Sequence, residues 1–229
     1  MKVGVIGVGR MGRILAERIS TDHEVVLFDA DIQGAAVVAE SLKLTSIDSL
    51  SALKVDAVVM AVPDNAVAPC LLSLHESGKI FNVFSVATNI SRETLAGLNR
   101  EGIRCLNVKI IGHAGEMGRG AKPVIVIDRG NSEMICVAKQ LFANVGHVVA
   151  EDADQVKLIN SVATEEALKA AVSIEKALMA AGISDAVMIR GALSQVAPGV
   201  LKAYAEDDLG PFARKIVKAL RDSAGEEMV

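Results

Sequence analysis

Four polar residues recur at helical spacing in the second half of the chain. Lys157, Asn160, Ser161 and Thr164 stand at positions i, i+3, i+4 and i+7, so on a helix they line one face. An ammonium beside an amide suits a site that reduces a carbonyl or oxidises an alcohol, because lysine can give the oxygen a proton or take it back. The spacing predicts Lys157 as acid-base group and Asn160 as its partner. The competing interpretation is a solvated lysine paired with Asp154.

A second pattern is the stretch GVGRMG at residues 7–12, which has the spacing G-x-G-x-x-G. A strand-like run precedes it, a helix-like run follows, and Asp29 ends the next strand-like run, which is the context that a dinucleotide-binding turn requires. Gly7 permits the tight turn, Gly9 lets the backbone approach a pyrophosphate, and Gly12 lets the helix pack on the strand. The pattern therefore predicts a nucleotide site at the start of this helix.

The acidic residue after the second strand indicates which nucleotide is bound. A carboxylate at Asp29 accepts hydrogen bonds from a ribose 2′-hydroxyl and repels a 2′-phosphate, so NAD is the expected cofactor. Arg10 and Met11 complete the predicted contacts within the turn. NADP stays open, because Arg10 or Arg13 can meet a phosphate.

Three further loops follow expected strands and should face the same crevice. They comprise residues 62–64, 85–89 and 109–120. The contacts predicted from them are Val62, Pro63 and Ser85 to the cofactor and His113 to the substrate or nicotinamide. A solvent-exposed loop histidine without a role is the alternative for His113.

Short apolar runs alternate with amphipathic segments up to about residue 150, and their valine and isoleucine content is typical of strands covered on both faces. The expected strands are residues 3–7, 24–29, 56–63, 79–86, 103–108, 123–128 and 147–150. Repeated strand-helix units predict a doubly wound, largely parallel sheet with right-handed crossovers. Residues 1–152 are thus expected to form a dinucleotide-binding Rossmann domain.

The strand pattern stops after residue 152. Residues 154–182 form one alanine-rich stretch of roughly 43 Å if helical throughout. Two shorter helices are expected at 185–206, with a break near residue 198, and at 211–223. Residues 153–229 are therefore predicted to be a small all-helical domain for substrate binding and dimerisation, because so small a domain with one very long helix needs a partner subunit to pack against.

The composition limits the remaining possibilities. With 229 residues, 51% hydrophobic and 23% charged, the chain can bury a sizeable core, and disorder is excluded. A net charge of −4 with scattered basic residues disfavours nucleic acid as a partner. Cys70, Cys105 and Cys136 are far apart and are expected to be buried free thiols rather than metal ligands. No signal-peptide pattern or membrane-length apolar run is present, so we expect a cytoplasmic protein.

Taken together, these residues resemble the 6-phosphogluconate dehydrogenase-like superfamily, and within it the β-hydroxyacid dehydrogenases such as 3-hydroxyisobutyrate dehydrogenase. Residues 7–12 fit the G-x-G-x-M-G opening, and residues 112–128 lie where those enzymes have a glycine-rich substrate loop followed by a strand. Residues 143–146 resemble the turn before the last strand, and residues 155–160 resemble the start of the catalytic helix. The resemblance implies an acid-base role for Lys157.

The substrate half departs from that pattern. Ile111, Gly112 and His113 stand where the superfamily has a serine and two glycines, and residues 85–90 are more similar to the corresponding loop of pyrroline-5-carboxylate reductases. The Ser/Gly-rich substrate helix of those reductases is missing, however.

Three functional hypotheses follow. The first is an NAD(P)-dependent oxidoreductase that moves hydride between nicotinamide and a small hydroxy or oxo acid. The second is an imine reductase similar to pyrroline-5-carboxylate reductase, and the third is a non-catalytic, dinucleotide-responsive binding protein.

Overall fold

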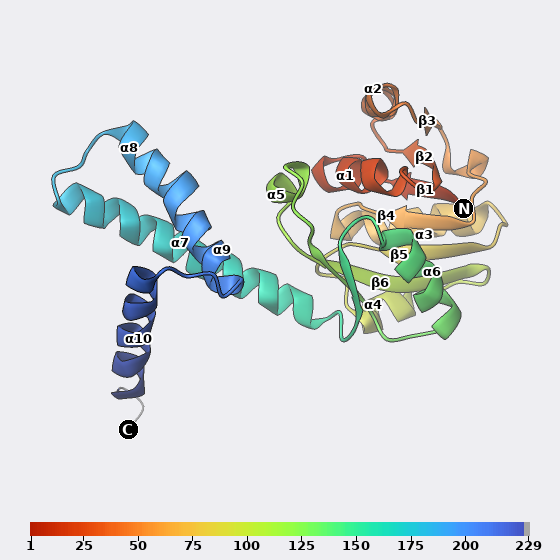
Figure 1. Ribbon diagram of the computed structural model, residues 1–229. Coiled ribbons are helices and arrows are strands. Elements are labelled where there is room, and N and C mark those ends of the chain that lie inside the picture. The colour runs from red at the N-terminus through yellow and green to blue at the C-terminus, as the bar shows by residue number, and fades with distance from the viewer. Residues whose placement is uncertain (227–229) are drawn as a thin grey trace. The chain divides into compact units, whose positions relative to one another are not determined.

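The computed structural model describes residues 1–226, and they form two compact units. The first unit comprises Met1–Val162 and the second begins at Ala163. The division falls inside the long helix α7 (Gln155–Ala180), since the first turn of α7 packs on the sheet through buried Val156 (Figure 1).

The first unit is built on one eight-stranded sheet with the strand order β3-β2-β1-β4-β5-β6-β7-β8. The strands are β1 (Lys2–Ile6), β2 (Glu24–Phe28), β3 (Thr45–Ser46), β4 (Ala57–Met60), β5 (Phe81–Ser85), β6 (Ile103–Ile111), β7 (Val124–Ile127) and β8 (His147–Ala150). All neighbouring strands run parallel except β6 and β7, which pair antiparallel. Ile6, at the end of β1, pairs with Phe28 on one side and Met60 on the other, so the strand ends that carry the site are in register.

Helices cover both faces of this sheet. The helices are α1 (Arg10–Ile19), α2 (Ile32–Leu42), α3 (Asp64–Glu76), α4 (Arg92–Gly97), α5 (Ala114–Gly118) and α6 (Ser132–Phe142), with the short 3₁₀ turn η1 (Leu50–Ala52). Residues of α1, α2, α5 and α6 share one core cluster with alternate strand residues, whereas α3, α4 and η1 share the other. The predicted doubly wound Rossmann arrangement is thus confirmed.

Because the sheet has an apolar core on each face, the sequences of its strands are continuous apolar runs. Val3 and Val5 point into the α1 core, and Ile6 into the α3 core, and all three are fully buried. Burial of each such side chain contributes about 1.5–3 kcal/mol. Phe84 meets Phe142 edge to face with ring centroids 6.4 Å apart, which joins β5 to α6.

Several local predictions need correction. The two-residue strand β3 carries no apolar run and was not expected. Residues 109–111, predicted as loop, continue β6, because they pair with β7 in the antiparallel ladder. The expected loop then contains the short helix α5. Cys70 and Cys105 are half-buried and Cys136 is exposed, so all three thiols are free as predicted but none is fully buried.

The second unit is all helical within its described residues. Beyond the shared helix α7 it contains α8 (Ala186–Gly191), the π-helical turn η2 (Ala192–Val196), α9 (Ala197–Ala205) and α10 (Pro211–Glu226). Gly182 ends the long helix with φ +82°, as expected for a glycine stop. The break expected near residue 198 is instead a π turn, because Pro198 lacks the N–H that would continue regular α-helical bonding.

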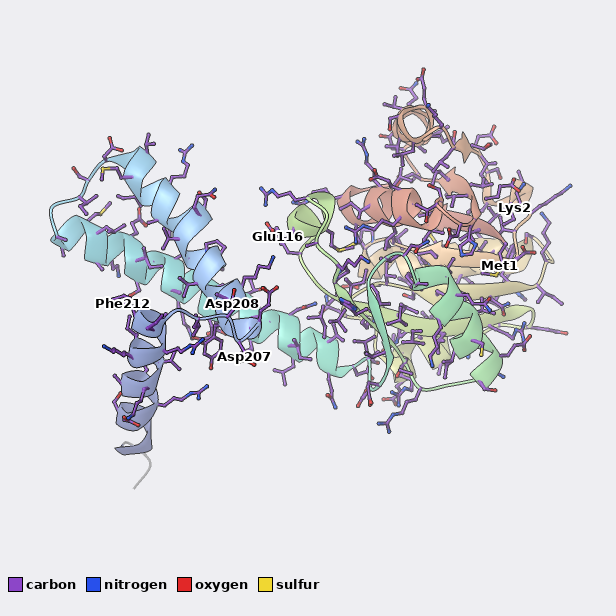
Figure 2. All side chains as sticks on the ribbon, in the orientation of Figure 1. Met1, Lys2, Glu116, Asp207, Asp208 and Phe212 are labelled. Carbon is purple, nitrogen blue, oxygen red and sulfur yellow. The ribbon has the colours of Figure 1, made fainter. Side chains whose placement is uncertain are left out.

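This helical unit leaves much apolar surface uncovered. Ile189 is the one apolar side chain that is buried among the described residues from 163 onward. The exposed apolar side chains of the unit are Leu168, Val172, Met179, Val187, Met188, Val196, Val200, Leu201, Tyr204, Phe212, Ile216 and Leu220. Figure 2 shows such side chains, with Phe212 labelled at the start of α10. None of the helices within residues 1–226 combines the length and the apolar character needed to cross a lipid bilayer.

Candidate cofactor and substrate site

The turn between β1 and α1 has the geometry that its glycines predict. Gly7 has φ +91°, and a Cβ there would lie 2.5 Å from the Ala61 carbonyl oxygen. A Cβ on Gly12 would lie 1.8 Å from the Gly7 carbonyl oxygen. A Cβ on Gly9, in contrast, would meet no atom within 4 Å. Gly7 and Gly12 are therefore needed for the turn itself, whereas the space beside Gly9 is open for a ligand.

The first turn of α1 is equipped for an anion. Its N-cap, Gly9, has no side chain to bond the free backbone N–H groups, and the first turn has no acidic residue. The neighbouring helix α3 differs, since it begins with Pro63 as N-cap and Asp64 in the first turn. The positive end of α3 is thus already balanced by a carboxylate, and a diphosphate is favoured at α1.

Asp29 follows β2 and is held beside the glycine turn. Its two carboxylate oxygens accept hydrogen bonds from the Val8 N–H at 2.7 Å and the Asp31 N–H at 3.0 Å. Asp31 itself caps α2 by accepting from the Gly34 N–H at 3.0 Å. Of these two carboxylates, that of Asp29 lines the cleft, where the adenosine ribose of a dinucleotide is expected, and it favours a free 2′-hydroxyl.

A cleft of about 800 Å³ runs along the carboxyl ends of the strands within the first unit. In Figure 2, Lys2 marks the end of this unit where β1 begins, and Glu116 on α5 lies at the opposite end. The cleft is lined by Ile6, Gly7, Gly9, Arg10, Met11, Phe28, Asp29, Ala30, Ala61, Val62, Pro63, Asp64, Ala66, Cys70, Val86, Ala87, Thr88, Asn89, Ile110, Gly112, Ala114 and Asn160. Seven of the predicted cofactor contacts are in this set: Gly7, Gly9, Arg10, Met11, Asp29, Val62 and Pro63.

The wall of the cleft beyond β4, here called the far wall, bears the polar residues Asp64, Asn89 and Asn160, and hydrogen bonds hold their side chains in place. The carboxylate of Asp64 accepts from the Asn89 side-chain amide at 2.7 Å and from the Asn89 backbone N–H at 3.2 Å. Asn160 reaches the wall from the second turn of α7 and donates from Nδ2 to the Ile110 carbonyl oxygen at 2.9 Å. The predicted amide therefore faces the cleft, and Asp64 brings a negative charge to the same end.

Other predicted site residues lie elsewhere. Lys157 is exposed and is absent from the cleft lining among the described side chains, although it is on the same helix as Asn160. His113 is exposed at the start of α5, with its ring against Gly115 rather than in the cleft wall. Ser85 is buried behind the loop that it was expected to present, and its Oγ has no partner among the described groups. Gly12 supports the turn from beneath, as its packing role predicts.

Sequence reasoning missed Lys109. This lysine lies in β6 and is only 1% exposed, and its Nζ donates to the carbonyl oxygens of Ala87 and Ile90. Burial lowers the pKa of Lys109 to about 8, while Asp154, Asp64 and Asp128 act in the opposite direction. The sequence does contain an indication of this residue's unusual position, because a lysine between Val108 and Ile110 interrupts an apolar run.

The family comparison agrees with this nucleotide site. Residues 2–87 match the family described as NADP oxidoreductase, coenzyme F420-dependent. A 42-residue segment is 48% identical to the NAD⁺-dependent, decarboxylating 6-phosphogluconate dehydrogenase of Haloferax volcanii. That segment covers 18% of this chain and 14% of the relative, so the likeness concerns only a small part of that enzyme.

Solved structures extend the likeness of fold to nearly the whole chain. The 1-pyrroline-5-carboxylate reductase of Streptococcus pyogenes is 21% identical, with a TM-score of 0.69 over 96% of this chain and 84% of the other. The imine reductase of Streptomyces aurantiacus is 18% identical, with a TM-score of 0.68 over 98% and 79%.

At the level of fold and cofactor class the predictions are confirmed. The chain has a Rossmann-like α/β unit, whose residues 2–87 match a family of NADP oxidoreductases, followed by a helical region with one long helix, and this match supports NAD or NADP as the cofactor. The narrower resemblance to the β-hydroxyacid dehydrogenases is not supported by these comparisons.

Proposed function

We propose that this protein is an NADH-dependent reductase of small, cyclic imines. The main observation in support is the cleft itself. At one end it has the uncapped N-terminus of α1, which suits a diphosphate, and at the other end a far wall that bears Asp64, Asn89 and Asn160. The two similar structures described above, a pyrroline-5-carboxylate reductase and an imine reductase, support the choice of a C=N substrate.

The chemistry of a C=N bond fits the groups at this wall. A protonated imine is a cation, so the carboxylate of Asp64 favours its binding. NADH held at the glycine turn and Asp29 would supply a hydride for the imine carbon, so that the C=N π electrons would become the nitrogen lone pair of the amine and NAD⁺ would be left. Because the nitrogen already carries its proton, the wall needs to orient and stabilise a cation rather than provide a strong acid. Asn160, held by the Ile110 carbonyl, is placed to orient the substrate.

The proposed choice of NADH rests on Asp29 and Asp31. Both carboxylates stand after β2, and Asp29 is fixed by two backbone N–H groups, so it cannot swing away without losing them. A 2′-phosphate placed there would meet negative charge. A ribose with a free 2′-hydroxyl can instead donate to Asp29.

A small oxo or hydroxy acid is the second candidate substrate. It is favoured by the position of Asn160 in the cleft, three residues after Lys157 on the same helix. In that mechanism Lys157 exchanges a proton with the substrate oxygen as hydride moves. His113 as a substrate contact and Ser85 as a cofactor contact belong to the same proposal.

The proposal includes a homodimer as the working form. The exposed apolar side chains of α7 to α10 support it, since so large an uncovered set is typical of a surface that meets another chain. Light scattering tests this directly, and a monomer at micromolar concentration contradicts it.

A substrate screen separates the candidates. Oxidation of NADH is followed by absorbance with 1-pyrroline-5-carboxylate and other cyclic imines, and in parallel with small oxo acids. Turnover of imines that survives the substitution Lys157→Ala supports the imine proposal. Turnover of oxo acids that Lys157→Ala abolishes, with NADH binding nearly intact, supports the second candidate. NADH binding without turnover of either class overturns both and favours the non-catalytic binding protein.

A further inference from the structure

The buried polar side chains of the chain gather on one face of the sheet. Four such residues are identified in the described part of the chain: Ser85, Asn107, Lys109 and Asp128. Ser85 pairs with Asn107 across β5 and β6, and Lys109 is two residues further along β6 on the same face. Asp128 follows β7, and its N–H donates to the Asn107 carbonyl oxygen at 3.0 Å. This polar cluster underlies the carboxyl edge of the sheet, beside α4.

Lys109 is the charged donor of the cluster, and its bonds go to one loop. Its Nζ donates to the Ala87 carbonyl oxygen and, at 2.6 Å, to the Ile90 carbonyl oxygen. Asn107 adds a second bond to the Ile90 carbonyl oxygen, from Nδ2 at 3.1 Å. Both ends of the loop of residues 86–90 are therefore tied to β6 from beneath.

The same loop forms the far wall of the cleft. Val86, Ala87, Thr88 and Asn89 all line it, and Asn89 is held from the side by Asp64. Asp29 follows β2 and this loop follows β5, and β1 and β4 lie between those two strands in the sheet. The loop is therefore at the opposite end of the cleft from the adenosine ribose that Asp29 is expected to bind. A dinucleotide that crosses the strand-order reversal at β1 and β4 brings its nicotinamide half to residues 86–90.

We propose that Lys109 is a positioning residue that fixes the loop of residues 86–90 against the nicotinamide half of the cofactor. The inference rests on the proposed function for the identity of the ligand. It rests on the hydrogen bonds of Lys109 for the role of this residue.

Packing alone does not explain a lysine at this position. Desolvation of an ammonium that has only neutral carbonyl oxygens as direct partners is costly, and a methionine would fill the same space without that cost. What the ammonium adds is a set of charge-assisted hydrogen bonds to backbone that no apolar side chain can hold. Such bonds would keep the loop rigid, so that it can hold the nicotinamide ring in one orientation.

The charge of Lys109 makes this support sensitive to pH. Burial lowers the pKa of its ammonium to about 8, and the opposing carboxylates are Asp154 at the start of α7, Asp64 on α3 and Asp128 after β7. Arg92 on α4 is a further charged group in the surroundings, and it pairs with Asp128 and Asp152 and donates its backbone N–H to Asp154. Above about pH 8 the amine is neutral, its bonds to the carbonyl oxygens weaken, and the wall loosens.

The chain offers a matched control in Lys79. Its Nζ also donates to two backbone carbonyl oxygens, those of Ser51 at 2.7 Å and Leu53 at 2.9 Å, but it does not line the cleft. Lys109→Met, Lys109→Arg and Lys79→Met are compared with the unaltered protein. Amide hydrogen exchange of residues 86–90 is measured without cofactor, and NADH affinity is measured from about pH 7 to about pH 9.5, a range that spans the transition.

Lys109→Met should speed exchange in the loop and weaken NADH binding about tenfold near pH 7, with little further change at higher pH. Lys109→Arg, which keeps its charge, should hold NADH without the alkaline loss seen in the unaltered protein. Lys79→Met should match the unaltered protein in both measurements.

Unchanged exchange in Lys109→Met, or an alkaline loss in Lys109→Arg at the same pH as in the unaltered protein, overturns the inference. If Lys109→Met fails to fold, Lys109→Arg alone decides by the same criterion. If the unaltered protein does not bind NADH, the proposed function fails, and the exchange measurement without cofactor still decides the role of Lys109.

Discussion

The substitution Gly9→Ala separates cofactor binding from folding more sharply than any other change in the glycine turn. Gly9 has φ −62° and ψ −170°, a conformation that alanine adopts readily, and the added Cβ meets no protein atom within 4 Å. The variant should therefore fold normally. It should even gain about 0.4–1 kcal/mol of stability, because alanine restricts the unfolded chain.

The same methyl group occupies the space that a diphosphate needs. It prevents close approach to the backbone N–H groups at the start of α1, which otherwise donate charge-assisted hydrogen bonds worth about 1.5–3 kcal/mol each. Loss of one such bond corresponds to a weakening of NADH binding of about 10- to 150-fold. We expect this loss with no decrease in melting temperature.

Gly12→Ala is the control with the opposite outcome. Its Cβ would stand 1.8 Å from the Gly7 carbonyl oxygen, so the backbone of the turn must shift, at a cost of about 1–3 kcal/mol or more. This variant should lose both stability and NADH affinity. Affinity is measured by calorimetric titration and stability by thermal unfolding. A Gly9→Ala protein that binds NADH as tightly as the unaltered protein would refute the placement of the diphosphate on this turn.

Three further predictions follow from the site. Asp29→Ser should shift the preference from NADH toward NADPH by about 1–3 kcal/mol, measured as the ratio of the two kcat/KM values, and an unchanged ratio would show that Asp29 does not face the ribose. Asp64→Asn should lower kcat/KM for cationic imines about tenfold and change NADH affinity less, because an amide oxygen can still accept from Asn89, and equal effects on both would place Asp64 at the cofactor instead. The unfolding free energy should rise between about pH 8 and pH 10.5, because there the unfolded chain binds the proton that folded Lys109 has released. Denaturant titrations should show this rise in Lys79→Met but not in Lys109→Met.

The parts of the fold that depend on local patterns could be predicted from the sequence. The glycine turn is an example, because the positive φ of Gly7 and the close approach of Gly12 to the Gly7 carbonyl arise within a single strand-turn-helix unit, and Gly9 leaves open space beside it. Asp29 is another, since its place after β2 follows from the parallel register of β1 and β2. The long helix and its stop at Gly182 also follow from local composition and backbone geometry.

The far wall of the cleft could not be predicted in the same way. Lys109 acquires its role only when the loop of residues 86–90 folds back over β6, a contact between segments about twenty residues apart. The antiparallel pairing with β7 extends β6 through residue 111, so the position expected for a loop lies in the sheet. The helical face of Lys157 and Asn160 was predicted as one stripe, yet only Asn160 reaches the cleft, because the start of α7 is set by the packing of Val156.

The transfer of deuterium to a cyclic imine, from NADH that carries deuterium at both C4 positions of the nicotinamide, reports the proposed hydride step itself. We expect an amine product that carries one deuterium at the former imine carbon, formed by the unaltered protein and, at a strongly reduced rate, by Gly9→Ala. Tight NADH binding with no deuterium in any imine offered, or equal transfer by the Gly9→Ala protein, would contradict this expectation.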